Sequence, residues 1–338
     1  MMAIATGGAI VKICVVGAGS IGGLIAACMA QAGFETSVVA RGAHLRAIQA
    51  HGLTLIEPEG RFTVKLPASD DPAAFGVQEI VFIGLKAHQI PAMLPSLKPL
   101  IGPHTVVVPA INGLPWWYFF REASAQDGAS IRVLDPQGSM FAALDPHHII
   151  GCVVHAAAEV SAPGEIRANG VRTFYLGEPD GSLSRRLNGL ADVMVHAGLE
   201  AHVSDKIRAE VWMKLIGNLT FNPVAALTRA NLREICDNPG LIAYMRRIME
   251  ETNAVSAAYG VPQVMSIERR LELAHSVGPV RSSMLQDLEA GRPMEIEPII
   301  GSVVELARNK GLATPFTDSL YAMISELARH QPAPAASA

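Results

Sequence analysis

The chain has little cysteine, and its cysteines lack the spacing that a metal site or a disulfide framework requires. The four cysteines are scattered, without a CxxC pair and without neighbouring histidines, at Cys14, Cys28, Cys152 and Cys236. Clustered cysteines mark zinc sites and small disulfide-bonded domains. We therefore expect reduced thiols in the protein core, no bound metal and a cytoplasmic location.

Long apolar runs and an excess of basic charge are also missing. No apolar stretch is long and uninterrupted enough to span a membrane. The formal net charge is −4, and no run of basic residues is interleaved with aromatic ones, which argues against a nucleic-acid partner. Residues 1–11 lack the charged segment that opens a secretory signal, so we expect no cleaved leader.

The length and the order of apolar patterns predict two domains. A chain of 338 residues exceeds what one core usually organises. Buried-strand patterns alternate with helical segments, as in a parallel sheet, at residues 12–16, 36–40, 79–85 and 105–111. Less regular strand patterns follow at residues 149–156 and 173–177.

Beyond Asp205 the pattern becomes helical. Amphipathic stretches cover residues 206–228, 241–259, 297–310 and 316–329. The predicted fold is therefore α/β, with an N-terminal Rossmann-type, doubly wound sheet and an all-helical C-terminal domain. We place the Rossmann domain at residues 12–204 and the helical domain at residues 205–329, with flexible termini at 1–11 and 330–338.

A glycine-rich turn follows the first predicted strand and opens a helix. It has the GxGxxG spacing and consists of Gly17, Ala18, Gly19, Ser20, Ile21 and Gly22. In this context Gly17 permits a tight turn, Gly19 lets the backbone approach a pyrophosphate, and Gly22 lets the helix pack closely on the strand. The sequence therefore predicts a dinucleotide-binding loop.

Residues after the next two strands bear on the cofactor. Arg41 follows the second strand where an acidic residue would hold the ribose 2′-hydroxyl of NAD. Because an arginine fork matches a phosphate, Arg41 favours NADP(H) over NAD(H). Lys86 follows the third strand at the edge where such sheets bind ligands, so it is a second candidate for a cofactor contact.

A polar row interrupts the apolar helix predicted at residues 206–228. Lys214, Asn218 and Asn222 recur every four residues and so lie on one helical face. Such groups cost free energy on a buried face unless a partner satisfies them, so the row meets a partner or lines a cavity. Pro223 disfavours helical geometry at Asn222, so we expect the helix to end or kink there.

The chain resembles the ketopantoate reductases (2-dehydropantoate 2-reductases), which join a Rossmann domain to an all-helical domain. The resemblance extends over nearly the whole chain and rests on dispersed motifs in the family's order: residues 17–22, Arg41, 85–87, Asn112 with Gly113, the row Lys214, Asn218 and Asn222, residues 282–287, and Glu295 with Ile296.

This resemblance implies NADPH-dependent reduction of 2-dehydropantoate to (R)-pantoate, a step in pantothenate synthesis. Lys214 would be the catalytic proton donor, and Asn112 would contact both cofactor and substrate. Asn218 and Asn222 would bind polar groups of the substrate, Ser283 its carboxylate, and Glu295 its distal hydroxyl. The implied partner is a small 2-keto acid; a homodimer formed through the helical domain is compatible with the sequence.

Several departures from the family pattern leave alternatives open. Apolar Ile111, Met294 and Ile300 stand where the family usually has polar residues, and residues 116–120 form an aromatic block. Losing a buried polar partner shifts preference by about 1–3 kcal/mol, so a paralogue that reduces a bulkier or more apolar 2-keto acid is an alternative. The aromatic block discriminates between them: Trp116 and Trp117 either line the pocket, which favours the paralogue, or pack the domain interface, which favours a true ketopantoate reductase.

Two further alternatives lie outside this activity. A non-catalytic NADP-binding protein could use the same fold, although the retention of Lys214 and Glu295 argues against it. The other alternative is a related Rossmann enzyme with a helical C-terminal domain, such as the β-hydroxyacid or 6-phosphogluconate dehydrogenases, from which Arg41 and the helical half alone do not distinguish this chain. The segment from Ser283 to Glu295 points away from them.

Overall fold

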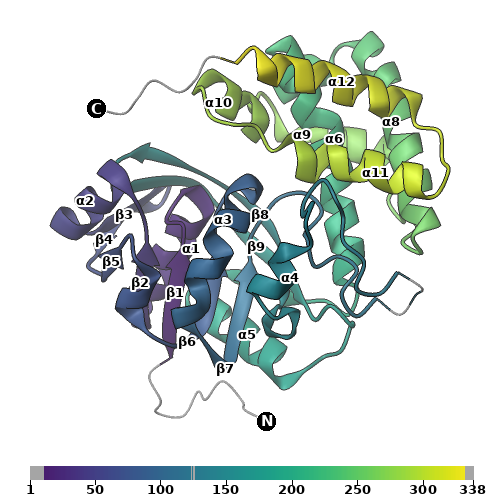
Figure 1. Ribbon diagram of the computed structural model, residues 1–338. Helices are drawn as coiled ribbons and strands as arrows, with labels where there is room; N and C mark the ends of the chain where they lie inside the picture. The colour runs from purple at the N-terminus through teal and green to yellow at the C-terminus, as the bar shows by residue number, and fades with distance from the viewer. Residues whose placement is uncertain (1–10, 123, 125, 332–338) are drawn as a thin grey trace. The chain divides into compact units, whose positions relative to one another are not determined.

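The computed structural model describes residues 11–122, 124 and 126–331 of the chain, which divides into two compact units (Figure 1). The first unit comprises the chain up to Ile111, together with Trp117–Ala129 and Gly138–Ile207. The second comprises Asn112–Trp116, Ser130–Gln137 and the chain from Arg208 onward. The helical unit therefore takes in two short segments from within the range that the sequence assigns to the Rossmann domain.

We expected flexible termini at residues 1–11 and 330–338. Of these, residues 1–10 and 332–338 lie outside the described residues. The described residues next to them are packed. Val11 is 9% exposed and belongs to the core of the first unit. At the other end, Gln331 donates a hydrogen bond of 2.9 Å to the carbonyl of Arg292.

A parallel sheet forms the centre of the first unit. Its order is β5-β2-β1-β6-β7, with the bounds β1 Lys12–Val16, β2 Glu35–Val39, β5 Ala68–Ser69, β6 Gln78–Ile83 and β7 Ile101–Pro109. The chain moves outward from β1 in one direction and then from β6 in the other. The sheet therefore has the predicted doubly wound arrangement, with its switch point between β1 and β6, where such folds bind ligands.

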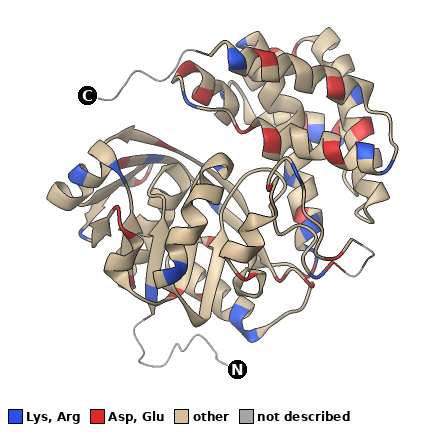
Figure 2. Cartoon of the chain, viewed as in Figure 1, with Lys and Arg blue, Asp and Glu red and all other residues tan. Residues whose placement is uncertain are grey.

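Charge in the central strands stays at their amino ends. Lys12, Glu35 and Glu79 stand at or next to the first residue of their strands, and the following residues of β1, β2 and β6 are buried. Elsewhere basic and acidic residues are interspersed, most densely on the helices of the second unit (Figure 2). The parallel strands thus read as continuous apolar runs because both faces of the sheet are covered.

A second sheet in the same unit is built around a long hairpin. It consists of β3 Leu53–Glu57, β4 Gly60–Val64, β8 Gly151–Ala162, β9 Glu165–Gly177 and β10 Glu200–Val203. β9 pairs with β8 along its length and, on its other edge, with β3 near its start and β10 near its end. The strands predicted at 149–156 and 173–177 are therefore parts of longer strands whose far halves are too exposed to read as core.

Helix α1 (Ser20–Gln31) is packed between the two sheets, which explains its run of small residues. Gly22 faces β1: a Cβ there would collide with the Gly17 carbonyl and lie 3.2 Å from Val15. Gly23 faces the second sheet, where a Cβ would lie 2.6 Å from the side chain of Ile166. The helix is thus buried on both sides. The remaining helices of this unit are α2 Gly42–His51, α3 Ile90–Met93, α4 Ser139–Ala143 and α5 Arg185–His196, with short 3₁₀ turns at Pro72–Phe75, Ala87–Gln89, Leu94–Leu100 and Pro146–His148.

The second unit is all-helical. It consists of α6 Ile207–Thr228, α7 Leu232–Cys236, α8 Pro239–Ala258, α9 Ile267–Val277, α10 Ser283–Glu289, a π-helical turn Glu297–Gly301, α11 Ser302–Asn309 and α12 Pro315–Arg329. Among the described residues no helix is long and apolar enough to cross a membrane.

The expectation that α6 ends or kinks at Asn222 is wrong as regards an end, because the helix runs through Pro223 to Thr228. Pro223 cannot donate to the helix ladder, and its ring crowds the preceding turn. Tertiary packing overrides this local cost: Pro223 is buried, and so is every residue from Leu219 to Ala226. Lys214, Asn218 and Asn222 therefore share one continuous helix.

Candidate active site

The glycine-rich loop of the first unit has the geometry that its sequence predicts. Gly17 has φ +92°, a conformation that L side chains rarely adopt. A Cβ on Gly22 would collide with the Gly17 carbonyl, so both positions require glycine. Gly84, just after β6, adds a constraint that the motif does not include: a Cβ there would lie 2.8 Å from Gly22 Cα. The backbone is thus closely packed around the start of α1.

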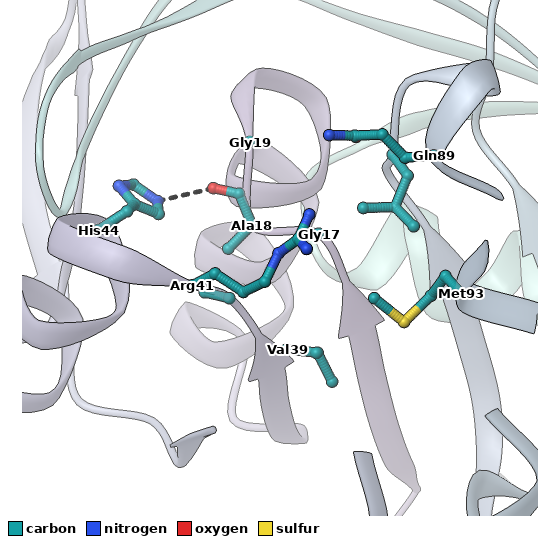
Figure 3. Close-up of a pocket in the computed structure, with 10 residues that line it drawn as sticks. Gly17, Ala18, Gly19, Val39, Arg41, His44, Gln89 and Met93 are labelled. Atoms are coloured by element: carbon teal, nitrogen blue, oxygen red, sulfur yellow. Dashed lines mark hydrogen bonds between the residues drawn. The ribbon is translucent and has the colours of Figure 1, made fainter. Parts of the chain in front are cut away.

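A hollow of about 140 Å³ lies at the carboxyl ends of the central strands (Figure 3). It is lined by ten residues: Gly17, Ala18, Gly19, Val39, Ala40, Arg41, His44, Leu85, Gln89 and Met93. Three strands deliver these residues, because Gly17 follows β1, Arg41 follows β2 and Leu85 follows β6. This is the position at which doubly wound sheets bind nucleotides.

The predicted cofactor residues are distributed unevenly around this hollow. Gly17, Ala18, Gly19 and Arg41 line it, whereas Ser20, Ile21 and Gly22 form the first turn of α1 behind the loop. Lys86 is not one of the described residues that line it. Its backbone N–H donates to Gln89 Oε1 at 3.1 Å, and Gln89 does line the hollow.

His44 and Met93 were not predicted as site residues, although both line the hollow. His44 Nε2 lies 2.7 Å from the Ala18 carbonyl oxygen, and its Nδ1 accepts a hydrogen bond of 2.9 Å from Gly164 N–H. Burial lowers the pKa of His44, and the hydrogen bond to Ala18 partly opposes that effect. The position of His44 one helical turn after Arg41 was the signal available in the sequence.

The second unit contains a hydrogen-bonded series that joins opposite charges through an amide. Lys214 Nζ, on α6, donates to Asn112 Oδ1 at 2.7 Å. Asn112 Nδ2 donates to Glu295 Oε2 at 3.2 Å. Glu295 is only 5% exposed, and Lys214 is partly buried. Residues far apart in the sequence thus place an ammonium, an amide and a carboxylate in one contiguous group.

The π-helical turn at Glu297–Gly301 explains how Asn112 reaches this group. The Leu114 N–H donates to the Pro298 carbonyl at 2.8 Å, which fastens the segment after β7 to the turn. Gly113 makes the approach possible, because it has φ +82° and a Cβ there would collide with the same carbonyl. Asn112 is therefore held beside Glu295 by backbone contacts on its C-terminal side.

The other predicted substrate residues lie in the same unit. Asn218 is partly buried one turn beyond Lys214, and Asn222, another turn on, is 7% exposed. Ser282 is buried and caps α10 by accepting from Leu285 N–H at 3.2 Å. Ser283, the first residue of the helix, is exposed. The cap therefore uses the first serine and leaves the hydroxyl of the second exposed.

The aromatic block belongs to the protein interior. Trp116, Trp117, Tyr118 and Phe119 are all at most 3% exposed. The Trp117 ring packs so closely against β8 that a Cβ on Gly151 would lie 2.6 Å from it. The apolar departures Met294 and Ile300 are buried as well. These side chains form core, and none of them lines the hollow described above.

The cysteines contribute no chemistry to either group. Cys14, Cys28 and Cys152 are buried, and Cys236 is partly buried. Burial raises the pKa of Cys14 to about 12 and that of Cys28 to about 11, so both stay protonated. Within the described part of the chain, no group of three or more His, Cys, Asp or Glu side chains could hold a metal ion.

Comparison with known proteins covers both units. Residues 13–181 match the family model described as "Ketopantoate reductase PanE/ApbA", and residues 206–328 match "Ketopantoate reductase PanE/ApbA C terminal". A 2-dehydropantoate 2-reductase from Mesorhizobium japonicum is 44% identical over 318 residues, which are 94% of this chain and 98% of the relative.

Solved structures show the same fold. A protein from Ralstonia solanacearum MolK2, provisionally assigned as a ketopantoate reductase, superposes with a TM-score of 0.91 at 38% identity, covering 96% of this chain and 99% of the other. The ternary structure of D-mandelate dehydrogenase with NADH and anilino(oxo)acetate has a TM-score of 0.81 at 22% identity, covering 94% and 98% of the two chains. At that identity the likeness concerns the fold alone.

Proposed function

Because the chain belongs to the ketopantoate reductase family, we propose that it reduces 2-dehydropantoate to (R)-pantoate with a nicotinamide dinucleotide, and that NADPH is preferred. The observation that carries this proposal is the series Lys214, Asn112 and Glu295, in which a proton donor is hydrogen-bonded through an amide to a buried carboxylate. The group has the donors and acceptors that a polar 2-keto acid requires.

The residues around the glycine-rich loop fit a dinucleotide. The collisions that a Cβ at position 17, 22 or 84 would cause leave room only for bare backbone there, which a pyrophosphate can approach. The start of α1 supplies unpaired N–H groups for anionic oxygens. When bound, the cofactor supplies a hydride to the carbonyl carbon of the substrate.

Lys214 serves as the proton donor. As the hydride adds to the carbonyl carbon, the carbonyl electron pair moves onto oxygen, and Nζ of Lys214 gives that oxygen its proton. The resulting neutral amine then regains a proton from solvent. Before transfer, the ammonium also stabilises the developing negative charge, so one side chain provides both acid and electrostatic catalysis.

Polar residues of the second unit hold the substrate. Asn112 orients the Lys214 ammonium and contacts both cofactor and substrate. Asn218 and Asn222 bind the polar groups of the substrate, and the exposed Ser283 binds its carboxylate. Glu295 accepts a hydrogen bond from the distal hydroxyl of the substrate. When no substrate is bound, the carboxylate accepts from Asn112 instead.

The preference for NADPH rests on Arg41. Its side chain lines the nucleotide hollow after β2, where a ribose 2′-phosphate lies in this type of fold. A guanidinium there binds the 2′-phosphate of NADPH through charge and hydrogen bonds. The acidic side chain that would accept a hydrogen bond from the 2′-hydroxyl of NADH is missing at this position. Since D-mandelate dehydrogenase uses a similar fold with NADH, the identity of this residue matters more than the fold.

Two further proposals concern the protein as a whole. The buried, protonated thiols suit a reducing compartment, so we infer a cytoplasmic location. A homodimer through the helical unit is compatible with the fold and is tested by the mass of the protein in solution.

The buried aromatic block gives no support to a paralogue that accepts bulkier 2-keto acids.

The test is steady-state turnover followed by nicotinamide absorbance. We expect 2-dehydropantoate to be reduced faster with NADPH than with NADH, and faster than bulkier 2-keto acids with either. A protein that binds NADPH but fails to reduce 2-dehydropantoate would refute the assignment. Preference for a bulkier acid would instead restore the alternative substrate class.

A further inference from the structure

His44 connects the glycine-rich loop to the second sheet through both of its ring nitrogens. Nδ1 faces a backbone N–H, that of Gly164, so this nitrogen must be the acceptor. The ring proton therefore resides on Nε2, which donates to the Ala18 carbonyl at 2.7 Å. Only the neutral ring with this tautomer satisfies both backbone groups, since a protonated ring has no acceptor.

The far end of this connection, Gly164, is held by contacts with two neighbouring elements. Gly164 lies in the turn between β8 and β9, and its carbonyl accepts from Thr54 N–H of β3 at 2.9 Å. A Cβ on Gly164, which has φ +79°, would lie 3.1 Å from Ala47 of α2, so the turn also packs on that helix. Its N–H is thus fixed in direction by contacts with two elements.

The near end determines the orientation of a peptide in the loop. In a planar trans peptide the N–H of Gly19 points opposite to the carbonyl of Ala18. By holding that carbonyl, His44 fixes the direction of the Gly19 N–H at the entrance to α1. Ala18, Gly19 and His44 all line the nucleotide hollow (Figure 3).

We propose that His44 is a positioning residue for the cofactor: as the neutral Nε2–H tautomer it holds the Ala18–Gly19 peptide in the orientation that binds the pyrophosphate of a nicotinamide dinucleotide. This inference rests on the proposed function, since it assumes that the hollow binds such a cofactor. His44 acts through the loop, whereas Arg41 acts on the ribose phosphate. Loss of His44 should therefore weaken NADPH and NADH binding alike, whereas loss of Arg41 should weaken mainly NADPH binding.

The variants His44→Phe and His44→Gln test the proposal. Phenylalanine keeps a ring but has neither nitrogen, whereas glutamine offers one donor and one acceptor and can reconnect the two backbone groups. We expect His44→Phe to weaken NADPH and NADH binding equally, about tenfold, as befits the loss of one oriented donor. His44→Gln should stay within about threefold of the unmodified protein.

The measurement is the dissociation constant of each dinucleotide by fluorescence titration, beside the melting temperature of each variant. A melting temperature that drops while both affinities hold would show a merely structural role and overturn the proposal. A loss confined to NADPH would also overturn it, because it would make His44 a ligand of the 2′-phosphate. Failure of the unmodified protein to bind either dinucleotide would refute the proposed function instead.

A second measurement does not depend on the folding of any variant. Long-range ¹⁵N–¹H spectra of the histidine-labelled protein distinguish the two neutral tautomers and the charged ring. We expect the His44 signals, identified by their loss in His44→Gln, to show the neutral Nε2–H form with and without NADPH. A charged ring or an Nδ1–H tautomer at neutral pH would overturn the proposal.

Discussion

Lys214 Nζ lies 2.7 Å from Asn112 Oδ1, although 102 residues separate the two in sequence. The amide thereby keeps the ammonium in a defined place, and its other end donates to Glu295. An amide can serve two opposite charges at once because it has both donor and acceptor atoms.

Replacing Lys214 by alanine should reduce kcat by about 10²- to 10⁴-fold, because both the proton donor and its charge are lost. NADPH affinity should be nearly unchanged, since Lys214 lies outside the nucleotide hollow. Turnover and cofactor titration are measured together. Lys206→Ala, at an exposed lysine just before α6, is the matched control. Loss of cofactor binding in Lys214→Ala would contradict the assignment.

Replacing Gly113 by alanine should displace Asn112 and so lower both stability and kcat. The residue has φ +82°, and the new methyl group would meet the Pro298 carbonyl. Strain of this kind costs about 1–3 kcal/mol, measured by denaturant unfolding. Gly217→Ala is the control for stability: its Cβ would meet nothing within 4 Å in a helix, so a gain of about 0.5–1 kcal/mol is expected. Equal losses of stability and kcat in the two variants would show that the contact between Gly113 and Pro298 has no special role.

Replacing Arg41 by alanine should weaken NADPH binding by about ten- to a hundredfold and leave NADH binding nearly unchanged. The reason is that only NADPH carries the phosphate that a guanidinium would hold. Dissociation constants for both cofactors are the measurement, and Arg46→Ala, at an exposed arginine within α2, the helix that begins just after Arg41, is the control. An equal effect on the two cofactors would remove Arg41 from the phosphate site.

Stability should fall as the pH drops below about 6.5, the ordinary pKa of histidine, in part because of His44. Burial lowers the pKa of His44 in the folded protein, so in this window the unfolded chain takes up a proton that the folded chain resists. The contribution of His44 to the free energy of unfolding is therefore fully present above the ordinary pKa of histidine. It is lost as the pH falls through the lower pKa that His44 has in the folded protein. Chemical unfolding at several pH values measures it. His44→Gln should show a shallower decline; an identical decline would assign the effect to other groups.

The sequence predicted the parts of the structure that local patterns encode. The glycine spacing required a strand, a turn and a helix, and all three are present at Lys12–Gln31. The polar row at 214, 218 and 222 depended on one helical period, and α6 provides it. These features follow from residues close together in the chain, so periodicity and spacing suffice to find them.

Features that depend on distant residues were missed. Nothing local indicates that Asn112 groups with the helical unit, because its position depends on the contact between Leu114 and Pro298. The effect of Pro223 was overestimated because the packing of α6 outweighs the lost hydrogen bond. The role of His44 depends on a turn 120 residues away. The roles of these three residues depend on contacts between distant parts of the chain, which only the tertiary structure shows.

The π-helical turn carries a consequence for how this family member could change. In that turn the Ser302 N–H bonds to the Glu297 carbonyl, five residues back, as in an α-helix that has gained one residue. Deleting a single residue between them would restore the ordinary ladder and rotate everything upstream by about 100° around the axis of α11. Glu295 and the Pro298 carbonyl would then face a new direction. A one-codon deletion within this turn, in which Pro298, Ile299, Ile300 and Gly301 are all buried, would thus separate the carboxylate from the amide and remove a residue of the core as well.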